Sequence, residues 1–238
     1  MAKAAFFQRD SGNFLLQSLP ENERRDLSRF LESVEVRPGQ RIYRQGRPID
    51  HLYFPTTAIL SWTGITRQGE RAEVGIVGRE GMLGLPHLLD YEAAPFDAEV
   101  AVAGEALRIH AVRIREQFDR LTALQKLLLR YAGAALTQVS QSNLCGLYHT
   151  VDQRLCRWLL TAHDRARGDE LSFTQDTVAG MIGARRPTVS IASGGLQKAG
   201  LIKVNRGRVT LLDRAGIEAA VCDCYWVIRR ALGIFLES

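Results

Sequence analysis

Short apolar runs separated by turn-forming residues dominate the chain from about Asn13 to Ala111. Segments such as Arg37-Pro-Gly-Gln40 and Val77-Gly-Arg-Glu-Gly81 break the sequence every few residues, and β-rich runs lie between them. The runs are Val34–Val36, Arg41–Tyr43, His51–Phe54, Ile59–Ile65, Glu73–Val77, Glu99–Val102 and Ala106–Ile109. Short strands at this spacing predict a small antiparallel barrel or roll. A helix at Glu21–Leu31 is predicted to precede them, because its apolar residues fall on one helical face.

The pattern changes to helical spacing from Ile114 to Thr150, a segment without proline. One stripe with alternating three- and four-residue spacing comprises Leu121, Leu124, Leu128, Tyr131, Ala135, Gln138, Ser142 and Cys145. A second stripe beside it comprises Leu127, Ala134, Leu144 and Tyr148. This pattern predicts one long helix that is buried on two sides, against its own domain and against a second copy of the chain. Burial within a single chain is the alternative.

A third region begins at Thr150, which forms a capping-box pattern with Gln153. A helix is expected to follow, ending near residue 168. The tail from Ile217 to Leu236 has the spacing of one or two amphipathic helices. We expect this tail to pack on the C-terminal domain.

Between these helices the sequence has the pattern of a helix-turn-helix. Apolar positions near Val178 predict one short helix, and Gly183 is placed where that helix ends in a left-handed turn. Pro187 falls in the first turn of a second helix, where its missing N–H costs nothing. Two helices joined so closely form the motif that places its second helix in the major groove of DNA.

A predicted hairpin follows at Gly200–Leu212, with Asn205-Arg-Gly207 at its tip, and it forms the wing of a winged helix. From Gly183 to Leu212 there are basic residues but no Asp or Glu. The basic residues are Arg185, Arg186, Lys198, Lys203, Arg206 and Arg208. Such a basic surface on this motif favours binding to double-stranded DNA.

The composition is that of an ordinary globular protein, with 46% hydrophobic and 24% charged residues and a formal net charge of +5 over 238 residues. It excludes disordered and collagenous chains. The longest stretch without Asp, Glu, Lys or Arg, Tyr131–Val151, holds too many polar side chains for a membrane span. The first residues lack the apolar region of a signal peptide. We therefore expect a cytoplasmic protein without a membrane partner.

The cysteines are too few for a disulfide framework in a chain of this length. They are Cys145, Cys156, Cys222 and Cys224. No Cys or His close in sequence to the Cys222-Asp-Cys224 pair completes a tetrahedral metal set. We expect reduced thiols, no metal site and no resident cofactor.

Sequence patterns of catalysis are also absent. The chain has no nucleophile elbow, phosphate-binding loop or HExxH pattern. A metal-dependent enzyme built on a β-roll would bring histidines together, but His51, His87 and His110 stand far apart in the sequence. We predict that the protein is not an enzyme, and whether these histidines converge in the fold tests this.

With its motifs in this order, the chain resembles the Crp/Fnr superfamily of transcription regulators over nearly its whole length. Pro38-Gly39 and Gly75–Gly84 resemble the sensory half, and Phe173–Gly183 and Arg186–Ser190 resemble the DNA-binding half. The resemblance implies an α+β fold. An N-terminal antiparallel β-roll of the cyclic-nucleotide-binding type spans residues 1–112, a long dimerisation helix spans 113–150, and a C-terminal winged helix-turn-helix spans 151–238.

The resemblance also implies which residues contact DNA. Base edges would be contacted by Arg186, Thr188 and Ser190, with Arg186 able to bond guanine bidentately. Phosphates would be held by Gln175, Arg185, Arg206 and Arg208. Arg185 and Arg186 could exchange these roles. Ser193-Gly-Gly195 is unusual inside a recognition helix, because each glycine costs about 1 kcal/mol relative to alanine. Three explanations are open. The glycines permit close packing, they keep the helix partly ordered until DNA binds, or they lower the helix stability without a functional purpose.

In family members that bind cyclic nucleotides, a glycine–glutamate pair and an arginine followed by serine or threonine hold the ribose and the cyclic phosphate. The corresponding positions here are Gly84-Leu85 and Phe96-Asp97, so the glutamate, the arginine and the hydroxyl residue are all missing. An anionic phosphate beside Asp97 would be repelled. We do not expect cyclic AMP to bind in the usual way. The pocket either takes an unidentified, less anionic effector or is filled by side chains such as Phe96.

The resulting hypothesis is a sequence-specific transcription regulator that acts as a homodimer on a palindromic operator in double-stranded DNA. RNA polymerase is a further partner if the protein activates transcription. The alternative is a protein-binding regulatory module whose winged helix does not read DNA, and loss of DNA affinity on replacing Arg186 and Arg206 would distinguish the two.

Overall fold

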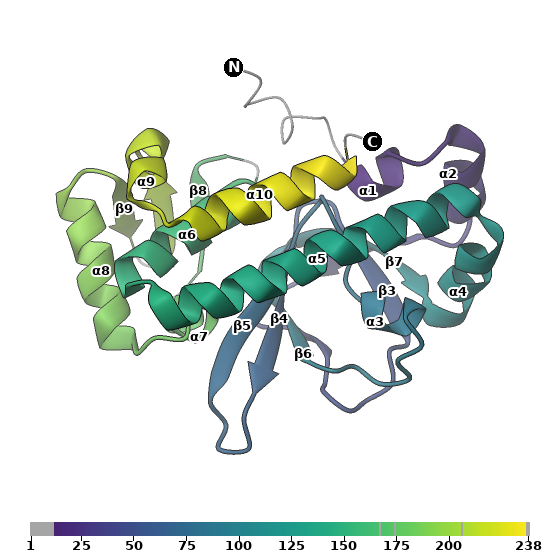
Figure 1. Cartoon of the computed structure of the whole chain (residues 1–238), viewed down its shortest axis with the longest axis horizontal. Helices are drawn as coiled ribbons and strands as arrows, with labels where there is room; N and C mark the ends of the chain where they lie inside the picture. The colour runs from purple at the N-terminus through teal and green to yellow at the C-terminus, as the bar shows by residue number, and fades with distance from the viewer. Residues whose placement is uncertain (1–11, 167, 174, 206, 237–238) are drawn as a thin grey trace.

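The computed structural model describes residues 12–166, 168–173, 175–205 and 207–236 (Figure 1). Its N-terminal half is a β-roll made of two antiparallel sheets, with strand orders β1-β7-β3 and β2-β6-β4-β5. The strands are β1 (Glu32–Val36), β2 (Arg41–Tyr43), β3 (His51–Pro55), β4 (Ile59–Ile65), β5 (Arg71–Val77), β6 (Asp97–Val102) and β7 (Gly104–His110). Each predicted run lies within one of these strands, and most of the strands extend beyond it by one to three residues, so the predicted roll is confirmed. Apolar side chains such as Leu52, Phe54 and Leu60 are fully buried between the sheets.

Short helices border the roll: α1 (Phe14–Gln17), α2 (Glu21–Ser28) and α3 (Leu85–Leu88). The predicted helix at Glu21–Leu31 is therefore three residues shorter than expected. No helix in the described part of the chain is long and apolar enough to cross a membrane.

The predicted single helix of the middle region is in fact two helices, α4 (Ala111–Arg120) and α5 (Thr122–Tyr148). Leu121 between them is extended, with φ −98° and ψ 103°. Glu23 of α2 accepts hydrogen bonds from the amides of Ala123 and Leu124, at 3.1 and 2.8 Å, and so caps the start of α5. A carboxylate at this position satisfies free amides and favours the positive end of the helix. The cap comes from about 100 residues away in the chain, so helical spacing alone does not reveal it.

The C-terminal half is a winged helix formed by α6 (Val151–His163), β8 (Glu170–Ser172), α7 (Gln175–Met181), α8 (Arg186–Lys198), β9 (Ile202–Asn205) and β10 (Arg208–Leu211). Thr150 and Gln153 form the predicted capping box at the start of α6. The strands pair in the order β8-β10-β9, and Asn205 faces Arg208 across the predicted hairpin tip. The α+β fold with a roll, a long helix and a winged helix-turn-helix is thus confirmed.

The tail forms two helices, α9 (Arg214–Ala220) and α10 (Asp223–Leu236). Figure 1 shows α10 lying lengthwise beside α5, and its buried Ile228 and Leu232 join the core of the roll and of α5. The tail was predicted to pack on the C-terminal domain. Helix α9 does so, because it contacts α6, whereas α10 packs mainly on α5.

The roll and α10 both pack on α5. The two apolar stripes that the sequence predicts on this helix are therefore largely buried within the chain. Leu124, Leu128 and Tyr131 are at most 2% exposed. In the second stripe Leu127 and Ala134 are buried too, whereas Leu144 and Tyr148 are exposed. The apolar surface that α5 leaves free is a third stripe, described below.

The roll and the winged helix are in direct contact. Ile59 and Ile76 of the roll belong to the same buried cluster as Trp158 of α6. At the edge of this cluster the Trp158 indole donates to Glu73 Oε2 of β5, at 3.4 Å. Burial raises the pKa of Glu73 to about 8 and outweighs the nearby charge of Arg157.

A buried ion pair also joins the two halves. Arg165, just after α6, lies 2.8 Å from Glu80 of the roll, and the two side chains are 2% and 1% exposed. Arg165 donates further hydrogen bonds to the Thr161 carbonyl at 2.8 Å and to Gln138 Oε1 of α5 at 3.3 Å. Gln138 in turn donates to the Ile76 carbonyl of β5, at 3.0 Å. This network connects the roll, the long helix and the winged helix.

Candidate nucleic-acid interface and sensor pocket

The two helices of the helix-turn-helix cross over a small apolar core. Val178 and Val189 are among the residues that close it, both at most 2% exposed. The turn between the helices contains Gly183, whose φ of +61° is the left-handed conformation predicted there. Arg154 of α6 donates to the carbonyls of Ile182 and Gly183, at 2.9 and 3.4 Å, and so satisfies the free carbonyls at the end of α7. The start of α8 is therefore held in a defined place.

The start of α8 faces solvent. Arg185, Arg186 and Thr188 are all exposed to solvent. Ser190 is half-buried, and its hydroxyl donates to Gln175 Oε1 of α7, at 2.6 Å. The fold thus brings these predicted residues together at the first turns of α7 and α8, where they form one polar surface. Their individual DNA contacts stay predictions.

Two of the predicted basic residues are paired with acids. Arg186 lies 3.5 Å from Asp176 of α7, and Arg208 lies 3.1 Å from Glu170 of β8. All four side chains are more than half exposed, so each pair contributes at most about 1 kcal/mol and is easily exchanged for a phosphate. Both acidic partners precede residue 183, so they lie outside the acid-free segment that was identified in the sequence.

A groove of about 480 Å³ separates the start of α8 from the wing. Arg186 lines one side and Arg208 of β10 lines the other. The predicted phosphate contact at Arg206 lies outside the described residues.

Gly194 and Gly195 lie on the exposed side of α8. A Cβ added to either would meet no other heavy atom within 4 Å. Close packing within the chain therefore does not explain these two glycines.

The predicted sensor pocket is present but almost filled. Its free volume is about 30 Å³, enclosed by residues that include Tyr43, Trp62, Gly84, Phe96 and Asp97. This is space for one or two water molecules, whereas pockets for drug-sized ligands measure about 300–1,000 Å³.

Two of the substituted positions, Phe96 and Asp97, line the remaining space, whereas Leu85 does not. Leu85 is 5% exposed and belongs to the apolar core, and Phe96 lines the pocket wall. Asp97 is buried, and its carboxylate accepts a hydrogen bond from the Gln45 amide at 2.7 Å and lies 3.6 Å from Arg41. The Asp97 carboxylate therefore binds groups of the protein itself, the Gln45 amide and the Arg41 side chain.

The histidines converge only in part. His51 and His110 face each other on β3 and β7, with their ring centroids 5.2 Å apart. His87 on α3 does not join them. Among the described residues, the one group of three or more potential metal ligands lies elsewhere, at the end of α5. Within the described residues of the roll, two of the three histidines therefore meet, and no third potential metal ligand joins them.

Comparison with known proteins agrees with this architecture. The sequence model of the cyclic nucleotide-binding domain matches residues 33–120, and that of the Crp-like helix-turn-helix domain matches residues 153–220. The transcriptional activator protein Anr of Pseudomonas aeruginosa is 26% identical over 185 residues, which are 75% of each chain. The transcriptional regulatory protein Btr of Bordetella pertussis is 25% identical over 222 residues, which cover 85% of this chain and 87% of that protein.

The fold has a similar counterpart among solved structures. The structure of FixK2 from Bradyrhizobium japonicum superposes with a TM-score of 0.70 at 15% identity, over 81% of this chain and 98% of that one. With both domain types in the same order and regulators of the same class as relatives, the chain belongs to the Crp/Fnr superfamily of DNA-binding transcription regulators.

Proposed function

We propose that the protein regulates transcription as a homodimer that reads an inverted repeat in double-stranded DNA without a cyclic nucleotide. The observation that carries this proposal is the exposed, basic start of α8, where the side chains of Arg185 and Arg186 lie in solvent. Arg154 holds the turn that leads into this helix. We assign regulation by binding rather than catalysis, and a cytoplasmic location follows from the need to reach the chromosome.

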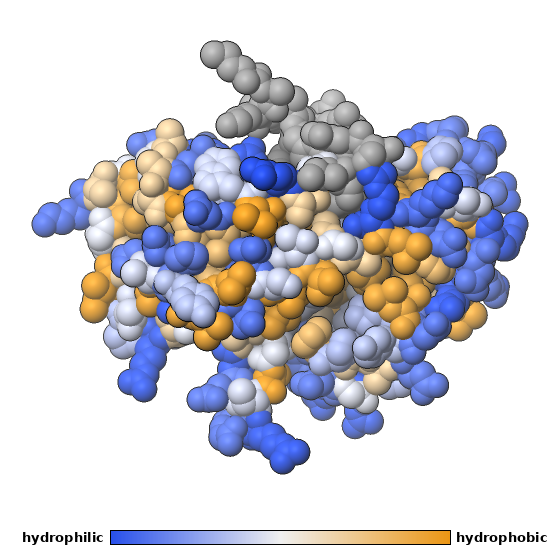
Figure 2. Space-filling view, viewed as in Figure 1, coloured by the Kyte–Doolittle hydropathy of each residue, from blue (hydrophilic) through white to orange (hydrophobic). Residues whose placement is uncertain are grey.

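Support for the homodimer comes from the third stripe of α5. It comprises Leu129, Gly133, Leu136, Ser140 and Leu147, together with Leu144 of the second stripe, and all of them are exposed. Leu136 and Leu147 are both 68% exposed. Figure 2 shows apolar side chains along this side of the molecule, over α5. The spacing of three and four residues is that of a coiled-coil seam, and it extends over about 27 Å at 1.5 Å per residue. Gly133 has no neighbour within 4 Å of its missing side chain, which leaves room for a second helix to approach.

Independence from cyclic nucleotides is supported by the filled pocket. Leu85 and Phe96 stand where family members that bind cyclic nucleotides have the glutamate and the arginine that hold the ribose and the phosphate. Asp97 adds a negative charge, and its carboxylate already accepts a hydrogen bond from the Gln45 amide. An activator would make RNA polymerase a further partner.

The test is a selection of bound fragments from random duplex DNA, using the purified protein without added nucleotide at near-physiological salt. We expect one palindromic motif with half-sites about 34 Å apart, as two recognition helices on one face of the duplex require. Recovery of no motif, with or without cyclic AMP, would contradict the proposal and favour the protein-binding alternative.

A further inference from the structure

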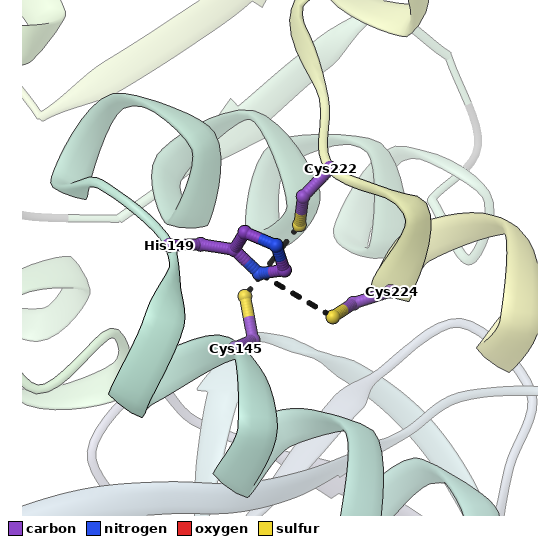
Figure 3. A group of neighbouring side chains, drawn as sticks. All are labelled: Cys145, His149, Cys222 and Cys224. Carbon is purple, nitrogen blue, oxygen red and sulfur yellow. Dashed lines mark hydrogen bonds between the residues drawn. The ribbon is translucent and has the colours of Figure 1, made fainter.

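A compact group of cysteine and histidine side chains lies where α5 ends (Figure 3). Cys145 is in the last turn of α5, His149 is the residue that ends this helix, and Cys222 and Cys224 lie at the start of α10. The sulfur atoms and one ring nitrogen all lie within 4.8 Å of one another. In the sequence the pair Cys222-Asp-Cys224 has no nearby partner, but the fold brings Cys145 and His149 to it from about 75 residues away.

Two distances within this Cys/His cluster are close to those of a tetrahedral site, and all of its ligand atoms lie within 4.8 Å of one another. Cys145 Sγ and Cys222 Sγ are 3.6 Å apart, and Cys224 Sγ is 3.5 Å from His149 Nδ1. With Zn–S bonds of about 2.3 Å and Zn–N bonds of about 2.0–2.1 Å, ligand atoms at the corners of a tetrahedron are separated by about 3.8 Å for two sulfurs and about 3.6 Å for sulfur and nitrogen. A cluster of several irons would spread its ligands farther apart than a single ion does.

The cysteines of the cluster are shielded from solvent, and a positive charge lies against one of them. The three cysteines are at most 4% exposed and form a small core of their own. Arg157 of α6 is 4% exposed and donates from Nε to Cys145 Sγ, at 3.2 Å. Three thiolates and one divalent ion leave a net charge of −1, and this guanidinium offsets it. A hydrogen-bond donor directed at a ligand sulfur is a regular companion of metal sites.

We propose that Cys145, His149, Cys222 and Cys224 bind one structural zinc ion that fixes α10 and the start of the DNA-binding half to the end of α5. With four protein ligands the site is closed, as structural zinc sites are, and it leaves no position for a substrate. Three thiolates and one imidazole are ligands that suit Zn²⁺.

The position of the site gives it a mechanical role. His149 directly precedes Thr150, the residue that caps α6, so the ion would hold the junction between the long helix and the winged helix. Arg157 lies on α6 itself, and α10 runs along α5. Loss of the ion would free this junction and loosen the placement of the recognition helices. This inference concerns a site separate from the DNA-contacting surface, so it holds or fails independently of the proposed function.

The test begins with the full-length chain purified under reducing conditions. Elemental analysis is expected to find about one zinc per chain, and replacement by Co²⁺ is expected to give the visible absorption of tetrahedral, thiolate-rich coordination. Cys224→Ser and His149→Ala are expected to lose the stoichiometric metal. Cys156→Ser is the matched control, because Cys156 is an equally buried cysteine outside the cluster, and it is expected to keep the metal.

A second measurement on the unmutated chain removes the risk that a variant fails to fold. With Zn²⁺ bound, Cys145, Cys222 and Cys224 should resist alkylation, and removal of zinc by a chelator should increase their modification at least tenfold while Cys156 changes little. Three results would overturn the proposal: no binding of added Zn²⁺ or Co²⁺ by the reduced chain, a Cys145–Cys222 disulfide in place of metal, or stoichiometric iron with inorganic sulfide.

Discussion

The buried ion pair between Arg165 and Glu80 provides a sharp test of how the two halves of the molecule are joined. Replacing Glu80 by Gln keeps the shape of the side chain but leaves the Arg165 guanidinium, which is 2% exposed, without its counter-charge. Removing one partner of a buried pair costs about 3–5 kcal/mol, because the remaining charge stays in a poorly solvating environment. The hydrogen bonds of Arg165 to Thr161 and Gln138 remain, and they orient the guanidinium without neutralising it.

The assay is thermal and urea unfolding followed by circular dichroism. For a chain of this size each kcal/mol lowers Tm by about 2–4 °C, so Glu80→Gln is expected to lower Tm by roughly 6–20 °C. Arg165→Met combined with Glu80→Gln removes both charges, and the double variant should be destabilised by at least about 2 kcal/mol less than the sum of the single variants. A loss below 1 kcal/mol for Glu80→Gln, or additive single effects, would refute the claim that this pair couples the halves.

Further predictions follow from the exposed glycines, the buried carboxyl group and the apolar stripe. Gly194→Ala and Gly195→Ala should each raise the free energy of unfolding by about 1 kcal/mol in urea titrations, and unchanged stability would show that helix α8 is not formed in the free protein. The pKa of Glu73 is raised to about 8 while an unfolded chain titrates near 4.3, so the folded state holds a proton that the unfolded state releases. Stability should therefore fall as pH rises from about 4.3 to 8, by up to about 1.4 kcal/mol per pH unit, and a stability–pH curve of Glu73→Gln that keeps this slope would contradict the assignment. If the protein forms the proposed dimer, Leu136→Glu should give a monomer in light scattering, whereas Leu89→Glu, at another exposed leucine, should leave the dimer intact. A dimer in both variants would place the contact between the two copies elsewhere.

Local patterns along the chain were sufficient to predict the roll and the winged helix. The strands of the roll are bounded by turn-forming residues, and the capping box at Thr150 and the left-handed turn at Gly183 are decided by neighbours within a few positions. These features depend on short-range interactions, so one sequence is enough to find them.

The features that were missed depend on contacts between distant segments. The break at Leu121 needs Glu23 from α2, and the burial of one side of α5 needs α10 from the far end of the chain. The Cys/His cluster forms only because α10 returns along α5 and brings Cys222 to Cys145. The substitutions in the sensor pocket were visible in the sequence. The hydrogen bond from the Gln45 amide to Asp97 was not, because the two residues are 52 positions apart.

The measurement that tests the central claim most directly is the affinity of the protein for its selected duplex, determined by fluorescence anisotropy over a range of salt concentrations. Arg186→Ala should weaken binding by about 1–3 kcal/mol, roughly 5- to 150-fold, and relax sequence preference, whereas Arg185→Ala should weaken all sequences alike and reduce the salt dependence. Arg29→Ala, at the end of α2, is the control and should leave affinity unchanged. Equal affinities of the Arg186→Ala variant and the unmutated protein for the selected duplex would contradict the account.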